Sequence, residues 1–239
     1  YGASIGGPII HGRTFYFANF EQRLLNQAGS PVITITPANL TAINTQLIAA
    51  GYPGSLISTG QYPNPVHNTN FLGKIDHHFS DRDQFSARYS LYDVHAVNSR
   101  GIGGLSTVSA ASGLSDLDQT IAVSNIYTLS SRTENETRAQ YTHSRLLAPP
   151  NDPTGPAVTI SGVASFGTLS GSPQGRLDHL FEVVDNLAHQ QGPHALRVGA
   201  DFLYNDLTIT FPQSIRGNYS FSNLSNFLTG TYSTFTQTF

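Results

Sequence analysis

Histidine residues are the first candidates for chemistry in this sequence, because imidazole binds metals and carries protons near neutral pH. His77 and His78 are adjacent, and adjacent residues of a strand point to opposite faces, so the two cannot bind one ion unaided. His179, His189 and His194 lie around one predicted hairpin, the last two near its turn. Surface histidines explain both groups more simply. We therefore expect no metal site and no cofactor.

Paired carboxylates are the second candidates, since a hydrolase can use two of them as acid and base. Asp116 with Asp118 and Glu134 with Glu136 would each share a strand face. Solvated charges on a polar face account for these pairs as well. The glycines of residues 101–104 lack the strand-to-helix context of a nucleotide-binding loop, and no G-x-S-x-G motif occurs. We predict that the chain is not an enzyme.

The composition excludes several other classes. The chain has 239 residues, of which 38% are hydrophobic and only 11% are charged, and no long apolar run suits a membrane-spanning helix. A net charge of -3 argues against a nucleic-acid partner. The absence of cysteine removes disulfides, thiolate ligands and cysteine nucleophiles. Because the chain opens on Tyr1 without a signal peptide, we expect an excerpt from a longer protein.

The element that organises the chain is the stretch 70–92, which alternates with period two. Apolar residues occupy most odd positions from Phe71 to Leu91, and polar residues such as Lys74 and Arg88 occupy even ones. The two arms meet at the short polar stretch 80–83. This pattern predicts an antiparallel β-hairpin with one apolar and one charged face.

The same unit recurs along the chain, with short turns inside the hairpins and long connections between them. We predict hairpins at about 4–20, 70–92, 119–145 and 179–205, and long loops at about 24–69, 93–118 and 146–178. Within the first loop, Thr36-Pro37 predicts the start of a short helix that Gly51 ends. The pairing of residues 206–239 is not evident from the pattern.

Regular alternation of short turns and long loops is typical of bacterial outer-membrane barrels. The fold class that we predict is therefore all-β: an antiparallel up-and-down barrel of outer-membrane type, present as a partial barrel of about eight strands within one domain. The charged face would line the lumen, with the candidates Lys74, Asp76, Arg88, Glu134, Glu136, Arg138, Arg197 and Asp201. The other face would meet outer-membrane lipid, with the candidates Phe71, Ile75, Phe79, Phe85, Tyr89, Tyr141, Val198 and Phe202.

Alternation alone is also compatible with a soluble antiparallel sheet that buries one face. The alternative function is therefore a soluble or surface-exposed β-sandwich module that binds a carbohydrate or protein ligand or mediates adhesion. The two hypotheses differ in whether the odd-position residues Ile75, Phe85 and Tyr89, with Val198, face lipid or a buried core.

Four stretches resemble a known family: SIGGPIIHGRTFYFANFEQR, NTNFLGKIDHHFSDRDQFSARYS, HALRVGADF and NYSFSNLSNFLTG. They are similar to strands and turns in the barrel of TonB-dependent outer-membrane transporters, specifically the Oar-like branch common in Acidobacteria-type genomes. The similarity covers roughly residues 1–23, 70–92, 119–145 and 179–239. The long connections match no pattern that we can name.

The resemblance implies a segment of a Gram-negative outer-membrane receptor that takes up an unidentified nutrient. It implies a larger barrel, a preceding plug domain, an N-terminal carboxypeptidase-regulatory-like domain and energy from the TonB system. We expect those preceding parts to lie outside this sequence, which would form roughly the first third of the barrel. An eight-stranded barrel complete in itself is the other possibility, because eight is the smallest usual strand number.

Overall fold

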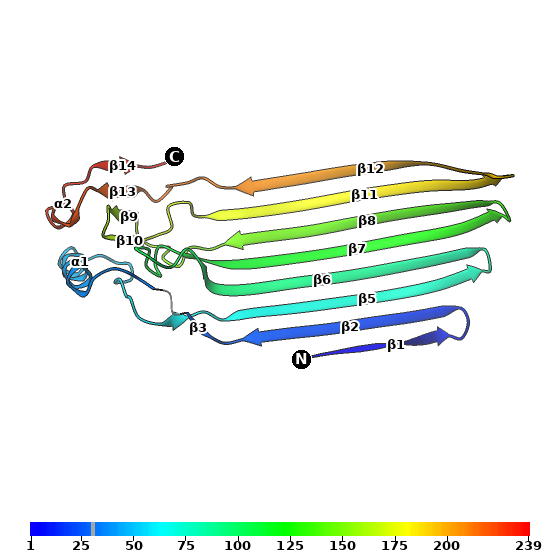
Figure 1. The fold of residues 1–239 in the computed structure, drawn as a ribbon, viewed down its shortest axis with the longest axis horizontal. Helices are drawn as coiled ribbons and strands as arrows, with labels where there is room; N and C mark the ends of the chain where they lie inside the picture. The colour runs from blue at the N-terminus through cyan, green and yellow to red at the C-terminus, as the bar shows by residue number, and fades with distance from the viewer. Residues whose placement is uncertain (30–31) are drawn as a thin grey trace.

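Eight long strands form one antiparallel sheet in which each strand pairs with the next long strand along the chain (Figure 1). The computed structural model describes residues 1–29 and 32–239. The sheet has the order β1-β2-β5-β6-β7-β8-β11-β12, and within the described residues its edges β1 and β12 do not pair, so it is open. The strand bounds are β1 Gly2–Ile10, β2 Thr14–Leu25, β5 Val66–Ser80, β6 Asp83–Arg100, β7 Ser112–Ser130, β8 Thr133–Ala148, β11 Gln174–Gln191 and β12 His194–Thr210.

The four hairpin turns gather at one end of the sheet (Figure 1). Two of them use the same device: the Ser80 hydroxyl accepts the backbone N–H of Arg82 at 3.2 Å, and Ser130 does the same for Arg132. Such side-chain to backbone bonds stabilise tight turns of polar residues. The register shifts by one position beside each of these two turns. The predicted turns at 80–83 and 130–133 are confirmed.

The strands extend well beyond the predicted bounds. β6 continues to Arg100 and β7 begins at Ser112, so only residues 101–111 connect them instead of the predicted 93–118. β11 likewise begins at Gln174 and β12 ends at Thr210. The prediction followed the apolar alternation, whereas backbone pairing continues where both faces carry polar residues such as Asp93 and Asp116. The ladder is therefore longer than the apolar pattern that reveals it.

At the end opposite the turns, the long connections and the C-terminal residues fold into a compact unit, which we call the cap (Figure 1). Its four-stranded sheet has the order β10-β9-β13-β14, and β13 runs parallel to β9. None of the described helices is long and apolar enough to cross a membrane. The bounds are β3 Ala28–Gly29, α1 Pro37–Ala49, β4 Tyr62–Pro63, β9 Ala157–Ile160, β10 Ala164–Gly167, β13 Asn218–Phe221, α2 Leu224–Leu228 and β14 Thr234–Thr236.

The predicted helix is confirmed as α1. Pro37 occupies its first turn, and the Thr36 hydroxyl caps it by accepting the N–H of Asn39 at 3.3 Å. Ile43 and Leu47 are buried at 0% and 6% exposure. The helix is therefore an integral part of the cap core.

The main hydrophobic core of the chain lies in the cap. Phe227 of α2 contacts the rings of Phe166 and Phe221 edge to face, with centroids 5.7 and 5.2 Å apart. Phe166 is 1% exposed. The residues whose pairing the sequence left open, 206–239, complete β12 and supply β13, α2 and β14. The full cluster contains Ile35, Ile43, Leu47, Ile57, Val158, Ile160, Ala164, Phe166, Phe221 and Phe227.

Candidate functional site

The strand register sorts the side chains of the sheet into two faces. Residues directly opposite one another in neighbouring strands point to the same side. One row of opposed residues is mostly polar: Lys74, Arg88, Ala122, Gln140, Glu182 and Leu203. The row beside it is also mostly polar: Asp76, Ser86, Ser124, Arg138, Val184 and Asp201. We call this side the polar face.

All eight residues predicted to face a lumen lie on the polar face. Lys74, Asp76, Arg88, Arg138 and Asp201 belong to the two rows above. Towards the turns, the same face carries Glu134, Glu136 and Arg197, with Glu134 and Arg197 both opposite Ala188. The polar face is not uniformly polar, because Phe15 and Phe17 of β2 also lie on it, opposite Asp76 and Lys74.

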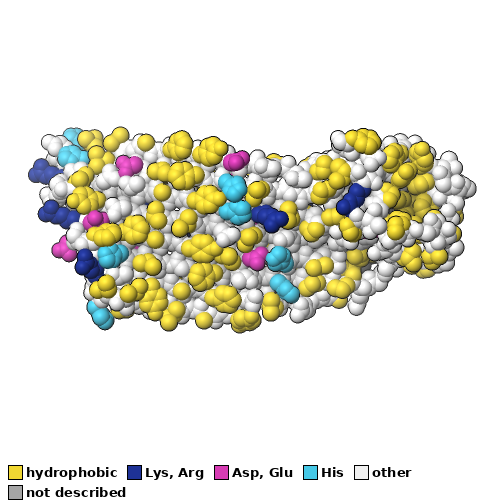
Figure 2. Space-filling model, turned by 180° about the vertical axis from the view of Figure 1, so that it is seen from behind, with side chains coloured by type: hydrophobic (Ala, Val, Ile, Leu, Met, Phe, Trp, Pro, Cys, Tyr) yellow, Lys and Arg dark blue, Asp and Glu magenta, His cyan; other side chains and the backbone are white. Residues whose placement is uncertain are grey.

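The opposite side, the apolar face, carries rows of aliphatic and aromatic residues. One row runs Ile75, Ala87, Val123, Ala139, Val183 and Phe202, and the next runs Gly73, Tyr89, Ile121, Tyr141, Phe181 and Tyr204. Hydrophobic side chains cover this face between the turns and a zone of histidine and charged residues nearer the cap (Figure 2). They are not buried by protein: Ile75 is 47% exposed and Val198 67%.

All eight residues predicted to meet lipid lie on the apolar face. Phe71, Ile75, Tyr89, Tyr141 and Phe202 belong to its rows or continue them. Val198 lies opposite Leu187, and Phe85 lies opposite His77. Phe79 lies at the register shift beside the turn, with its ring 4.5 Å from that of His77 and 6.3 Å from that of Phe85. The register thus separates the two predicted sets completely.

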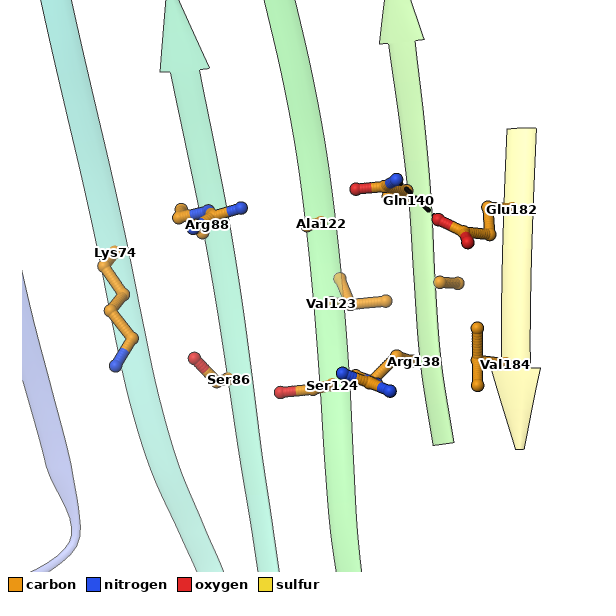
Figure 3. Close-up of a pocket in the computed structure, with 11 residues that line it drawn as sticks. Lys74, Ser86, Arg88, Ala122, Val123, Ser124, Arg138, Gln140, Glu182 and Val184 are labelled. Carbon is orange, nitrogen blue, oxygen red and sulfur yellow. Dashed lines mark hydrogen bonds between the residues drawn. The ribbon is translucent and has the colours of Figure 1, made fainter. Parts of the chain in front are cut away.

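The polar face is hollowed into a cavity of about 370 Å³ (Figure 3). Lys74, Arg88 and Arg138 line it from three strands, and the hydroxyls of Ser86 and Ser124 lie between them. At its margin the Gln140 amide donates to Glu182 Oε2 at 2.6 Å. None of the residues that line this cavity is aromatic. Its lining thus combines hydrogen-bond donors with positive charges.

The sequence pattern did not reveal Ser86, Ser124, Gln140 or Glu182 as members of a site. Each looks like an ordinary polar position of a strand. Their association depends on cross-strand register, which pairs Gln140 with Glu182 and Ser124 with Ser86. Parity along each strand would have assigned them to the correct face, but the row that each occupies follows only from the pairing.

His189 and His194 lie beside the turn of the β11–β12 hairpin, as expected, and His179 lies apart from them. His189 Nδ1 bonds the Thr133 hydroxyl at 2.9 Å near the turn, whereas His179 lies on the cap side of the same strand. His179 instead contacts the Tyr141 hydroxyl at 2.7 Å, and its ring centroid lies 4.9 Å from that of His143. The pairing of His143 with His179 across two strands was not predicted from the sequence.

His77 and His78 point to opposite faces, as adjacency in a strand requires. His77 Nδ1 lies 2.8 Å from the Thr14 hydroxyl, while the ring of His78 packs beside Phe15 on the polar face. In the part of the chain that the structure describes, no three His, Asp or Glu residues are grouped to hold a metal ion.

The carboxylate pairs lie at opposite ends of the polar face. Asp118 lies opposite Ser144, which in turn lies opposite Asp178, on the cap side of the sheet. Glu136, near the turns, forms an ion pair with Arg138 at 3.7 Å. The two carboxylate pairs are therefore charges spread along the strands of the polar face.

The cap contains a second polar cluster, centred on Asp152. This carboxylate accepts the Tyr52 hydroxyl at 3.0 Å and the backbone N–H of Thr154 at 2.8 Å. Burial, and then the adjacent carboxylate, raise the pKa of Tyr52 well above its ordinary value. The polar groups of this cluster satisfy one another, so its role is to hold the cap loops together.

Comparisons with known proteins agree with the geometry. The family model described as "Outer membrane beta barrel domain" matches residues 43–239, more than half of the chain. No curated protein matches at a significant level. Among solved structures, the crystal structure of the outer membrane transporter YddB from Escherichia coli superposes with a TM-score of 0.63 at 11% identity. The match covers 92% of this chain and 27% of that transporter. The chain therefore belongs to the outer membrane beta barrel domain family, and its open antiparallel sheet is a partial barrel of the outer membrane.

Proposed function

We propose that this chain forms part of the barrel wall of a TonB-dependent transporter of the Oar-like branch, which takes up a nutrient across the outer membrane. The observation that carries the proposal is the separation of the sheet into an apolar face and a charged, hollowed face, with a folded cap at one end only. In this arrangement the polar face lines the lumen, and outer-membrane lipid covers the apolar face.

The orientation follows from the two ends of the sheet. Short turns lie on the periplasmic side of outer-membrane barrels, and long loops lie outside the cell. The turns at residues 81–82 and 131–132 are then periplasmic, and the cap faces the medium. Energy would come from contact with TonB on the periplasmic side, through parts of the full-length protein other than this sheet.

Single-cysteine labelling tests both the orientation and the assignment of the faces, because the chain has no cysteine of its own. In intact cells, Thr41→Cys on the cap should react with a membrane-impermeant maleimide, and Ser131→Cys at a turn should not. In vesicles, a bilayer-confined thiol probe should label Ile75→Cys and spare Ser86→Cys. Reversal of either pattern would contradict the proposal.

Photo-crosslinking of the full-length protein to TonB in cells tests the energy source. A persistent absence of cross-links would contradict the proposed dependence on TonB.

The soluble β-sandwich is less well supported. A sandwich buries the inner faces of two sheets against each other. In the described structure Ile75, Val198 and Phe202 remain 47%, 67% and 61% exposed. Solubility of the full-length protein as a monomer without detergent would restore that alternative.

A further inference from the structure

A group of polar side chains interrupts the apolar face. We call it the polar island, and its members are Asp83, Asn125, Asn135, Thr137 and Asp185. Three of them lie directly opposite one another in β7, β8 and β11. The row on their cap side is apolar from Ile75 to Phe202, and the row towards the turns contains Leu187 and Val198. The island thus extends from the turn at Asp83 into the interior of the apolar face, as far as Asp185.

Asp185 is exposed and lies far from both ends of the apolar face. It follows His179, on the cap side of its strand, by six residues and precedes Gly192 of the hairpin turn by seven. At about 3.4 Å per residue, each lies roughly 20 Å or more away along the strand. With the apolar face in lipid, the Asp185 carboxylate would be near the middle of the bilayer. Ionisable residues are costly at such a depth and mark functional sites.

The hydrogen-bond donors of the polar island are already used within the chain. The Asn135 amide donates to the Thr137 hydroxyl at 3.1 Å and to Asp185 Oδ1 at 2.8 Å, and the Thr137 hydroxyl donates to the same carboxylate oxygen at 2.6 Å. The Asn125 amide donates to Asp83 Oδ1 at 2.7 Å and to a backbone oxygen of β6 at 3.3 Å. An asparagine amide has two N–H groups and a threonine hydroxyl has one O–H, so every side-chain donor has its acceptor. The island therefore presents only acceptors to a partner, namely carboxylate and amide oxygens.

The location of the island decides where its partner comes from. Among the described residues, no Lys, Arg or His side chain lies within 4 Å of the Asp83 or Asp185 carboxylate. Further strands of the barrel would extend the sheet at β1 and β12, and a plug would lie on the polar face, so neither would cover the island. A lipid headgroup lies at the edge of the apolar band, whereas Leu187 and Val198 separate Asp185 from the turns. A ligand of Asp185 must therefore reach it from within the bilayer.

We infer that the polar island binds a second protein of the outer membrane, which presents an arginine or lysine side chain at this depth. The inference rests on the proposed function, because it requires the apolar face to lie in the bilayer. A cation with several N–H donors complements two carboxylates and the amide oxygens beside them. A second copy of this chain fits poorly, since a two-fold contact would set the same patch against itself, carboxylate to carboxylate.

Photo-crosslinking of the full-length protein in cells tests the contact. Benzoylphenylalanine in place of Leu187, which lies opposite Asn135, should form an adduct with one outer-membrane protein. The same group in place of Ile75, in β5 on the same face, should form much less of it. Mass spectrometry should find the linked segment of the partner next to an arginine or lysine. An adduct with a second copy of the chain, a linked segment without such a cation, or no adduct at all would overturn the inference.

Substitutions of Asp185 decide whether the island itself makes the contact. Loss of a charge-assisted hydrogen bond predicts roughly tenfold less adduct in Asp185→Asn. Asp185→Lys should abolish the adduct, and exchange of the partner's cation for aspartate should restore it. The matched control Asp201→Asn removes a carboxylate from the polar face of β12 and should leave the adduct unchanged. Equal adduct in the wild type, Asp185→Asn and Asp185→Lys would overturn the inference.

Urea titration in lipid vesicles separates the contact from folding. Asp185→Asn should unfold at the wild-type urea concentration or higher, because it removes a charge from the bilayer. Asp185→Glu keeps the charge and should retain the adduct. If Asp185→Asn is destabilised and Asp185→Glu also loses the adduct, the island has a structural role only and the inference fails.

Failure of this inference is distinguishable from failure of the proposed function. If the bilayer-confined probe labels Ile75→Cys and no adduct depends on Asp185, only the partner contact is lost. If the probe spares Ile75→Cys, the lipid assignment of the apolar face fails together with the contact.

Discussion

The sheet and the cap differ in how far their apolar side chains are buried by protein. In the cap, Ile43 and Phe166 are almost fully buried among other side chains, as in a water-soluble domain. In the sheet, apolar residues such as Ile75 stay about half exposed, and the cross-strand ladder is the main contact between elements. The difference teaches that the cap buries its apolar residues as a water-soluble domain does, whereas the sheet leaves one apolar face uncovered by protein, the face that lipid would cover under the proposed function.

The largest expected effect is the loss of stability when a cavity is created in the cap core. Phe166→Ala removes a ring that lies against Phe227 in the cap core and should cost about 3 to 5 kcal/mol of cap stability. Hydrogen exchange of the cap amides in the full-length protein measures the loss. The matched control, Phe202→Ala, removes a 61% exposed ring from the apolar face and should leave the cap amides unchanged. Similar losses of cap protection in both variants would contradict the comparison.

A charge placed on the apolar face tests the role of lipid. Ile75→Arg should cost roughly 2 to 4 kcal/mol if this position lies near the middle of the bilayer. Urea titration of the protein in lipid vesicles measures the change in folding free energy. Ile48→Arg, at an exposed position of α1, is the control and should be close to neutral. A loss near zero for Ile75→Arg would mean that this face does not meet lipid.

Helix capping offers a smaller test, confined to the cap. Thr36→Ala removes the hydroxyl that accepts the Asn39 N–H and should cost about 1 kcal/mol. Faster hydrogen exchange in the first turn of α1 would report it. Thr41→Ala, at an exposed position within the same helix, should not weaken the helix because alanine has the higher helix propensity. Equal acceleration by both substitutions would show that the hydrogen bond from the Asn39 N–H to the Thr36 hydroxyl contributes little to helix stability.

The smallest effect concerns alkaline pH. The raised pKa of Tyr52 means that the folded cap favours the neutral phenol. An unfolded tyrosine ionises near pH 10, so the contribution is complete below that pH and is lost progressively above it. Cap protection in the wild type should therefore fall above about pH 10, and Tyr52→Phe should show a flatter dependence. Identical pH profiles would exclude Tyr52 as the cause.

Local sequence patterns were sufficient to predict the elements that are formed by residues close together in the chain. Alternation from Phe71 to Leu91 revealed a hairpin, and the polar residues after Ser80 revealed its turn. Thr36-Pro37 fixed the start of α1. The alternation of short and long connections was sufficient to predict an outer-membrane barrel. Such barrels have short turns on one side of the membrane and long loops on the other, and this difference does not depend on any single contact.

The cap was not predictable, because its core joins segments that carry no strong pattern of their own. Val158 of β9 packs in one cluster with Ile43 and Phe221, which are more than 60 residues away in each direction along the chain. β13 also pairs in parallel with β9, and no turn signal announces a pairing of that kind.

The sequence by itself determined which residues share a face, since the period of a strand is two and needs no partner. It thereby assigned Lys74, Asp76, Arg88 and Arg138 to one side and Ile75 and Phe202 to the other. Only the tertiary structure decided which of them are neighbours. Register is a property of strand pairs, and it sets Lys74 against Arg88 and Ser124 against Arg138 to form one cavity.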